Sequence, residues 1–353
     1  MRAPADATGT RTAGPARDRT VLVWTARTPT VHPVERFQTG LLILAMGVGI
    51  AVGQYADLAA AADRAVLPAL LGVLFLTFLG VPLGAVRGAL ADRRFVATSL
   101  GFNFLWTPLL AAGLATLFLR DHPDLWVGLL MLLVTPCTDW YLAFTDLADG
   151  NVPLATSLLP YNLLLQVALL PVYLYVFAGA AVDVPVAALV EAVLFVLVAP
   201  LVGAAVARYA AVRLRSRRWL ARVADRTGPA QVVLLAVAVG AMFASQGALL
   251  LERPLVPVLI GVPLLAFFAV NFVAGTLVSR VAGFDYEDRV CFACTTLARN
   301  SPTALAVAVA AFPDRPLIAL ALVVGPLVEL PLLSVLTRVL RATRGNDTAP
   351  ASA

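Results

Sequence analysis

A cysteine follows a proline in the middle of a long apolar segment. Pro136 and Cys137 stand in Leu-Val-Thr-Pro-Cys-Thr-Asp-Trp, residues 133–140, and Asp139 lies two residues further on. Proline has no amide hydrogen and clashes with the preceding turn, so it kinks or breaks a helix. In lipid, such a break needs protein or a water-filled cavity around its freed backbone groups. A thiol and a carboxylate at a break are typical of a transporter's solute site; a proline kink beside a small apolar cysteine is the alternative.

A second set of polar residues surrounds another proline, Pro302. Arg299, Asn300 and Ser301 precede it and Thr303 follows it, all within an apolar segment. An arginine at the membrane centre costs about 2.5–3.5 kcal/mol on insertion scales, so it should face a cavity or a partner. Two apposed breaks would supply carbonyls for a cation and half-helix N-termini for electron-rich oxygens. We therefore predict helix breaks at Pro136 and Pro302, and one substrate cavity lined by Cys137, Asp139, Arg299, Asn300, Ser301 and Thr303.

The composition indicates an all-α integral membrane protein. Of the 353 residues, 60% are hydrophobic and only 13% are charged, whereas a soluble domain usually has about 25% charged residues. The net charge of +5 comes from arginines that cluster at the expected membrane edges, so we expect the lipid bilayer and no nucleic acid as a partner. Three cysteines do not form a disulfide framework. No nucleophile–base pair or metal-ligand cluster appears, so we expect neither an enzyme nor a cofactor.

Apolar segments of roughly 20 residues predict ten membrane spans. We expect them at 37–55, 65–84, 95–119, 125–146, 153–178, 184–207, 228–250, 254–279, 290–312 and 316–340. If both termini are cytoplasmic, 21 of the 26 basic residues lie inside, as the positive-inside rule requires. We therefore expect a multi-pass protein of the cell membrane with both termini in the cytoplasm.

The chain also shows a weak internal repeat. Three pairs of positions, separated by 166 or 168 residues, lie five spans apart: Asn103-Phe104 with Asn271-Phe272, Pro136 with Pro302, and Pro160 with Pro326. Five is odd, so the second half would cross the membrane in the opposite orientation. The expected domains are a disordered cytoplasmic tail (1–34), a first five-helix repeat (35–207), a basic cytoplasmic connector (208–227), a second five-helix repeat (228–342) and a second disordered tail (343–353).

The residues around the breaks resemble the bile acid:sodium symporter superfamily, and most closely its arsenite efflux permeases. The resemblance covers roughly residues 37–340. It is carried by the uninterrupted segment from Thr135 through Pro136-Cys137 to Asp146-Leu-Ala and Gly150, by Gly325-Pro-Leu-Val-Glu-Leu-Pro331, and by Asn103, Pro108, Asn162 and Gln166.

The resemblance implies ten helices in two inverted repeats, with the fourth and ninth helices broken and crossed in a core domain that moves against a panel domain. It also implies an essential cysteine, here Cys137. Two positions depart from the permease pattern. Thr303 stands where the permeases have a glutamate, and Arg299 stands where they have a small polar residue.

Two functions are compatible with these residues. The first is export of arsenite or a related trivalent metalloid in exchange for protons. Thiolate is the best protein ligand for soft centres, so Cys137 would bind the metalloid transiently. The second is a sodium-coupled symporter of an organic anion, with Arg299 as the anion contact.

Other polar residues would support the cavity or bind the coupling proton or sodium ion: Asn103, Asn162, Gln166 and Glu329. Buried carboxylates suit proton exchange, although Glu329 could instead satisfy backbone groups freed by neighbouring prolines. Asp139 and Arg299 could pair and leave a neutral site. Cys291 and Cys294 share one helix face and are either packing residues or a second soft site.

Overall fold

The computed structural model describes residues 38–80, 92–138, 140–178, 186–216, 219, 223 and 227–347. The expected N-terminal tail, Asp139 and eight residues of the basic connector (217, 218, 220–222 and 224–226) lie outside this part of the chain. The elements are α2 (Gln38–Val52), α3 (Ala56–Gly80), α5 (Arg93–Gly101), η2 (Phe102–Trp106), α6 (Thr107–Leu119), α7 (Pro123–Val134), α8 (Trp140–Leu147), α9 (Val152–Tyr173), η3 (Leu174–Ala178), α10 (Val186–Val193), η4 (Leu194–Val198), α11 (Ala199–Leu214), α13 (Thr227–Glu252), α14 (Val256–Val281), α15 (Tyr286–Leu297), α16 (Ser301–Ala311) and α17 (Pro316–Asp347). The elements labelled η are short π-helical segments within longer helices.

Every regular element in the described ranges is a helix, which confirms the predicted all-α class. Within the described ranges, seven helices are long and apolar enough to cross a membrane: 57–80, 93–119, 152–177, 189–214, 227–246, 256–281 and 316–342. Each coincides with a predicted span. The other three predicted spans correspond to a short apolar helix, 40–52, and to the pairs α7–α8 and α15–α16, which are interrupted. The total of ten crossings and the inverted repeat stay predictions.

Two predicted limits differ from the observed helices. Helix α11 continues to Leu214, past the expected start of the connector at 208. Helix α17 continues to Asp347, past the expected start of the C-terminal tail at 343. The first residues of the expected connector and of the expected C-terminal tail are therefore helical, and they continue α11 and α17 beyond their apolar segments. The domain limits at 207 and 228 also stay a prediction. The three paired positions of the internal repeat favour a limit between η3 and α10, which leaves five predicted spans on each side.

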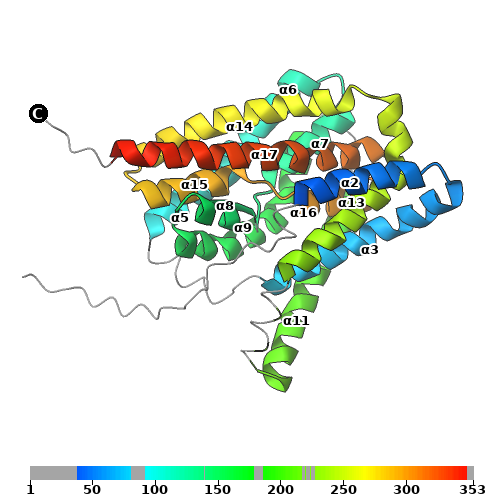
Figure 1. The fold of residues 1–353 in the computed structure, drawn as a ribbon, viewed down its shortest axis with the longest axis horizontal. Helices are drawn as coiled ribbons and strands as arrows, with labels where there is room; N and C mark the ends of the chain where they lie inside the picture. The colour runs from blue at the N-terminus through cyan, green and yellow to red at the C-terminus, as the bar shows by residue number, and fades with distance from the viewer. Residues whose placement is uncertain are drawn as a thin grey trace, which may run out of the picture. The chain divides into compact units, whose positions relative to one another are not determined.

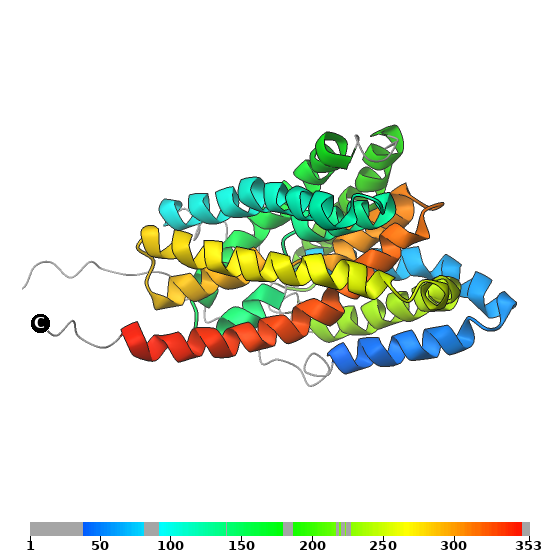
Figure 2. The ribbon, with the colours of Figure 1, turned by 90° about the horizontal axis from the view of Figure 1, so that it is seen from above.

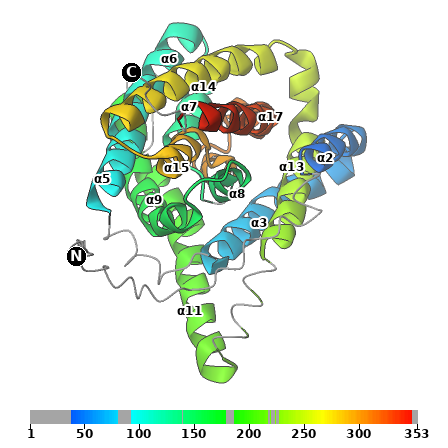
Figure 3. The ribbon, with the colours of Figure 1, turned by 60° about the vertical axis from the view of Figure 1, so that its left-hand side comes forward.

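The helices form two groups (Figure 1). In the first group α13 packs along α2 and α3, and α11 packs against α3. In the second group α17 packs against α7, α14 and α16, while α15 contacts α14, α8 and α9. Figure 2 shows α14 and α17, in yellow and red, running side by side. Figure 3 shows α2, α3 and α13 together, and contacts of α3 with α16 and of α2 with α17 join the groups.

Glycines allow α2 to lie almost on the backbone of α13. A Cβ added at Gly49 would lie 2.3 Å from the carbonyl oxygen of Gly240, and one at Gly53 would lie 2.4 Å from that of Ala244. Small residues spaced four apart permit such close contact between membrane helices, whose association depends on van der Waals packing. The two glycines therefore fix how α2 and α13 pack.

A π-helical segment interrupts the helix formed by α5 and α6. Pro108 has no N–H group to donate to the carbonyl of Phe104, four residues earlier. The hydroxyl of Tyr173 in α9 donates to that carbonyl instead, at 2.6 Å. The π-helical turn from Phe102 to Trp106 contains Asn103, which is fully buried. Such turns are frequent at functional sites, and this one turns an amide into the protein interior.

We expect Gly49→Ala to destabilise the protein, because the new methyl group meets a backbone carbonyl that cannot move alone. Overpacking of this kind costs about 1–3 kcal/mol. The matched control is Gly47→Ala in the same helix, where nothing lies within 4 Å of the added Cβ. Thermal unfolding of the purified variants in detergent measures both effects. An equal midpoint for the two variants would contradict the proposed helix contact.

Candidate functional site

The two interrupted helices cross at their interruptions. Between α7 and α8, and between α15 and α16, the chain is extended, and Pro136 faces Arg299 in an isolated antiparallel bridge. Two backbone hydrogen bonds flank this bridge, from Cys137 N to Ala298 O at 3.0 Å and from Asn300 N to Thr135 O at 2.8 Å. The interruptions predicted at the two prolines are therefore present, and they are joined to each other.

The two prolines act differently at the crossing. Pro136 lies in the bridge, at a position that needs no N–H donor. The carbonyl of Leu132, four residues earlier, receives the Thr135 hydroxyl at 3.1 Å instead. Pro302 lies in the first turn of α16, where a missing N–H costs nothing and the fixed φ favours a helix start. The second proline thus lies in the first turn of a half-helix, while the three residues before Ser301, at positions 298–300, make the interruption.

Arg299 is buried at the crossing and binds the C-terminal ends of two half-helices. Its side chain is 2% exposed. Nη1 donates to the carbonyl of Leu133 at the end of α7, at 2.9 Å. At the end of α15, Nε donates to the carbonyl of Leu297 at 3.2 Å and Nη2 to that of Thr296. Nη2 also donates to Asn103 Oδ1 at 3.3 Å. Last-turn carbonyls have no partner within their own helix and carry the negative end of the helix dipole, so one guanidinium satisfies both ends.

A glutamate compensates the buried arginine. Glu329 in α17 is 3% exposed, and its Oε1 accepts the backbone N–H of Arg299 at 2.7 Å. The carboxylate and the guanidinium also interact electrostatically. The guanidinium lies over the ring of Phe267, 5.3 Å from its centroid, which adds a cation–π contact. Glu329 therefore binds the segment between α15 and α16.

Two asparagines from different helices donate hydrogen bonds to carbonyls at the C-terminal end of α15. Asn103 Nδ2 donates to the carbonyl of Thr295 at 3.3 Å, and Asn271 Nδ2 donates to that of Thr296 at 2.6 Å. Asn271 Oδ1 in turn accepts Trp106 Nε1 at 3.0 Å. These asparagines form one of the position pairs in the sequence repeat. Sequence analysis did not assign Asn271 to the site, although the pair with Asn103 was the available signal.

Cys137 lies at the N-terminus of α8. Its side chain is buried, and its Sγ accepts the backbone N–H of Trp140 at 3.3 Å. The sulfur therefore takes the position of a helix cap, where N–H groups and the helix dipole stabilise negative charge. On the facing half-helix, Asn300 Oδ1 caps α16 by accepting the N–H of Thr303 at 3.2 Å. Asn300 Nδ2 reaches Thr138 Oγ1 at 3.5 Å. Both half-helix N-termini thus open onto the crossing.

Several buried polar side-chain atoms of the described residues, including those of Ser301 and Thr303 beside the crossing, lack a hydrogen-bond partner. Within the described residues, seven such atoms belong to Ser99, Thr107, Asn162, Gln166, Ser301 and Thr303. The last four of these residues are ones that sequence analysis assigned to the site. Asn162 still donates through Nδ2 to Thr295 Oγ1 at 3.2 Å, but both polar atoms of Gln166 are without a partner. Unpartnered buried polar atoms are costly and rare, so these are candidates to contact a polar solute.

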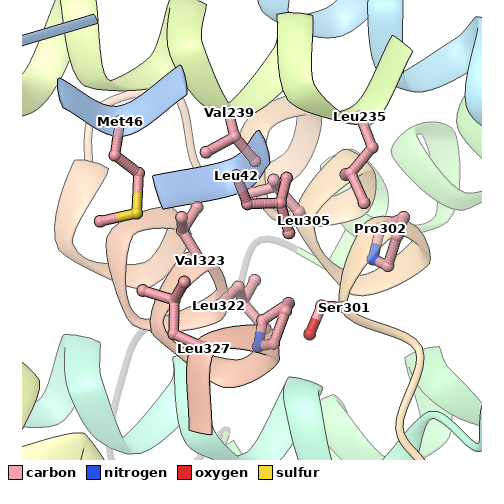
Figure 4. Close-up of a pocket in the computed structure, with 11 residues that line it drawn as sticks. Leu42, Met46, Leu235, Val239, Ser301, Pro302, Leu305, Leu322, Val323 and Leu327 are labelled. Atoms are coloured by element: carbon pink, nitrogen blue, oxygen red, sulfur yellow. The ribbon is translucent and has the colours of Figure 1, made fainter. Parts of the chain in front are cut away.

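A narrow apolar crevice reaches the start of α16 between the two helix groups (Figure 4). Its volume is about 10 Å³, roughly what one water molecule needs. It is lined by Leu42, Met46, Leu235, Val239, Ser301, Pro302, Leu305, Leu322, Val323, Pro326 and Leu327. Ser301 and Pro302 are its residues nearest the crossing, and the crevice is closed to any larger molecule in this conformation.

The far end of α8 is tied to the start of α15. The backbone N–H of Asn151 donates to the carbonyl of Glu287 at 3.0 Å, and Asn151 Nδ2 donates to Asp288 Oδ1 at 2.8 Å. Tyr286 adds a bond from its hydroxyl to the carbonyl of Ala148, at 3.0 Å. Burial raises the pKa of Asp288, an effect that the bond from Asn151 partly offsets. The two interrupted helices are therefore joined at the crossing and again at this end.

The remaining sequence predictions have mixed outcomes. Asp139 lies outside the described residues, so its expected pairing with Arg299 stays a prediction. Cys291 and Cys294 are fully buried free thiols. In the part of the chain that the structure describes, no group of three or more histidine, cysteine or carboxylate residues could hold a metal ion.

A bundle of membrane-spanning helices with a buried, polar crossing of two interrupted helices defines a membrane transporter. The family model for the Sodium Bile acid symporter family matches residues 67–253, which include the first interruption. The chain therefore belongs to this family, is a secondary transporter rather than an enzyme, and is a multi-pass membrane protein.

Two curated relatives are similar to the chain. The "Arsenical-resistance protein Acr3" of Corynebacterium glutamicum is 26% identical over 283 residues, 76% of each chain. The "Uncharacterized transporter slr0944" of Synechocystis is 29% identical over 222 residues, 61% of this chain and 57% of that protein. The predicted resemblance to the bile acid:sodium symporters and arsenite permeases is confirmed.

We expect Asn103→Leu to destabilise the protein more than Asn271→Leu. The first change removes an acceptor from a buried guanidinium and the donor to the Thr295 carbonyl, a loss of about 2–4 kcal/mol. The second leaves the Thr296 carbonyl still bonded to Arg299, so it should cost about 1–2 kcal/mol. Unfolding midpoints of the two purified variants check the order, and the reverse order would contradict the role assigned to Arg299.

Proposed function

We propose that this transporter exports arsenite or a related trivalent metalloid in exchange for protons. In this proposal the chain crosses the cell membrane ten times, as two inverted repeats with both termini in the cytoplasm. The solute binds where the two interrupted helices cross. Cys137, Asn300, Ser301 and Thr303 contact it, together with Asp139. Asn103, Asn162 and Gln166 support the cavity.

The observation that carries this proposal is the position of Cys137 Sγ. The sulfur sits at a half-helix N-terminus beside the crossing, where negative charge on sulfur is stabilised. Thiolate is the preferred protein ligand of a soft trivalent metalloid. One thiol can hold such a solute and still release it. The similarity to an arsenical-resistance protein over 76% of the chain supports the same solute.

The unpartnered polar atoms suit the rest of the solute. A hydrated trivalent metalloid carries hydroxyl groups that both donate and accept hydrogen bonds. The free hydroxyls of Ser301 and Thr303 and the free amide of Gln166 offer matching groups. An uncharged solute of this kind also needs no counter-charge, which agrees with a site where Arg299 and Glu329 already compensate one another.

Glu329 is the proposed proton carrier. Among the described residues it is the only buried carboxylate. It receives the backbone N–H of Arg299 in the interruption, so protonation would weaken a bond that helps to hold the crossing. A carboxylate on α17 can thus couple proton binding to the shape of the site, although Thr303 occupies the position of the permease glutamate.

A sodium-coupled symporter of an organic anion is the second candidate function. The family to which the chain belongs favours it by name. In that case Arg299 would contact the anion. Four hydrogen bonds to protein acceptors already use the guanidinium, and the group has five N–H donors. At most one donor remains for a solute, so the geometry favours the first function.

We expect Cys137→Ser to abolish arsenite resistance in a host that lacks its own exporter, because a hydroxyl is a poor ligand for a soft metalloid. Cys291→Ser and Cys294→Ser are matched controls, since both thiols are fully buried in α15, and they should keep resistance. Growth on graded arsenite, with expression measured in membranes, gives the result. Full resistance of the Cys137 variant would refute the thiol-ligand proposal.

We expect Glu329→Gln to uncouple transport from protons. The amide keeps an oxygen that can accept the Arg299 N–H but binds no proton at physiological pH. In everted membrane vesicles, arsenite accumulation driven by a pH gradient should fall to background, while arsenite exchange without a gradient persists. The control is Glu191→Gln, an exposed carboxylate in α10. Gradient-driven accumulation at the wild-type rate would exclude Glu329 as the proton carrier.

A further inference from the structure

The crossing contains the set of ligands that a small cation uses in a transporter. Interrupted helices bind a coupling cation through unwound carbonyls and half-helix C-terminal ends. Here these oxygens are the carbonyls of Leu133, Thr296 and Leu297, together with Asn103 Oδ1. All four are engaged by one group, the guanidinium of Arg299.

We propose that Arg299 is a tethered replacement for the coupling cation, so that no sodium ion binds at this crossing. The family name implies sodium coupling, but the residues present do not fit a sodium ion. The oxygens that would coordinate it already accept N–H donors. A second positive charge at the same oxygens would also be repelled by the guanidinium at contact distance.

The surroundings of Arg299 are those of a permanent ligand rather than of a solute contact. The side chain is 2% exposed and stacks on Phe267. Its bonds reach α7, α15 and the π-helical segment, and its own backbone N–H is bonded to Glu329. Arginine cannot lose its proton in a protein, so this cation stays at the crossing throughout the transport cycle.

A tethered cation changes which ion can drive the transport cycle. A bound sodium ion would stabilise the crossing only when present, whereas a tethered cation stabilises it at all times. The cycle then needs a different ion to drive it, which agrees with the proton coupling of the proposed function. The inference deepens that proposal, yet it concerns the stability of the crossing and not the identity of the solute.

The test measures thermal unfolding of the purified full chain in detergent. Choline chloride is replaced by sodium chloride at constant ionic strength, for the wild type and for Arg299→Ala and Arg299→Lys. Guanidinium chloride is added separately at low millimolar concentrations, where it does not denature. The matched control is Arg208→Ala, because Arg208 also donates to last-turn carbonyls, those of Phe78 and Leu79 in α3 at 3.4 and 3.2 Å.

We expect no sodium-specific shift in the wild type or in Arg299→Lys. Arg299→Ala should unfold at a lower temperature, and guanidinium should raise its midpoint saturably, by roughly 2–4 °C, and not that of Arg208→Ala. A saturable sodium shift in the wild type would overturn the inference. So would a folded Arg299→Ala that neither loses stability nor gains it from guanidinium. If Arg299→Ala does not fold, the sodium titrations of the other two proteins decide.

These outcomes are independent of the transported solute. If Cys137→Ser keeps arsenite resistance while sodium leaves the wild type unchanged, the proposed function fails and the inference about Arg299 stands. If the wild type binds sodium while Cys137→Ser loses resistance, the inference fails and the metalloid function stands.

Discussion

The structure of the site depends on one interaction, the binding of the Arg299 guanidinium to the C-terminal ends of two half-helices. Interrupting a helix in a membrane leaves several carbonyls without partners, and each costs free energy when water is excluded. Burying an arginine is costly for the same reason. Each cost offsets the other here, because the guanidinium supplies the donors that the carbonyls of Leu133, Thr296 and Leu297 need. Glu329 adds a buried acceptor beside this arginine, because it accepts the backbone N–H of Arg299 at 2.7 Å.

This arrangement divides the crossing into two unlike sides. The negative helix ends are occupied by side chains: Arg299 bridges α7 and α15, while Asn103 and Asn271 hold the remaining carbonyls of α15. At the positive helix ends, among the described residues, the thiol of Cys137 accepts an N–H at the start of α8 and the side-chain oxygen of Asn300 accepts one at the start of α16. A solute at the proposed site would therefore meet N–H groups, hydroxyls and a sulfur rather than carbonyls. The polar groups at the crossing that can bind a solute thus depend on which helix ends already have hydrogen-bond partners within the protein.

The sequence predicted the interruptions because their cause is local. Proline chemistry and polar residues in apolar segments are visible in the sequence and pointed to Ser301 and Thr303, whereas Asn162 and Gln166 were assigned through the family resemblance. The acceptors that join the Arg299 side chain to other helices were not predictable, since Leu133 and Asn103 are 166 and 196 residues distant in the sequence. The same holds for Tyr173, which compensates Pro108 from another helix. The missing N–H at Pro108 was a local signal that some partner was needed, but not which one.

The packing also limits how the site can open. The two interrupted helices are joined at the crossing through paired backbone bonds and at their far end through Asn151, which favours their movement as one body. Helices α2 and α13 are held together through Gly49 and Gly53 at backbone contact. The boundary between these bodies is the narrow crevice that ends at Ser301 and Pro302, and its lining is almost wholly apolar. Apolar surfaces can slide without breaking hydrogen bonds, whereas separating the crossing would uncover Arg299. In the proposed function, a solute would therefore reach its site through movement along the crevice, while the arginine stays bound.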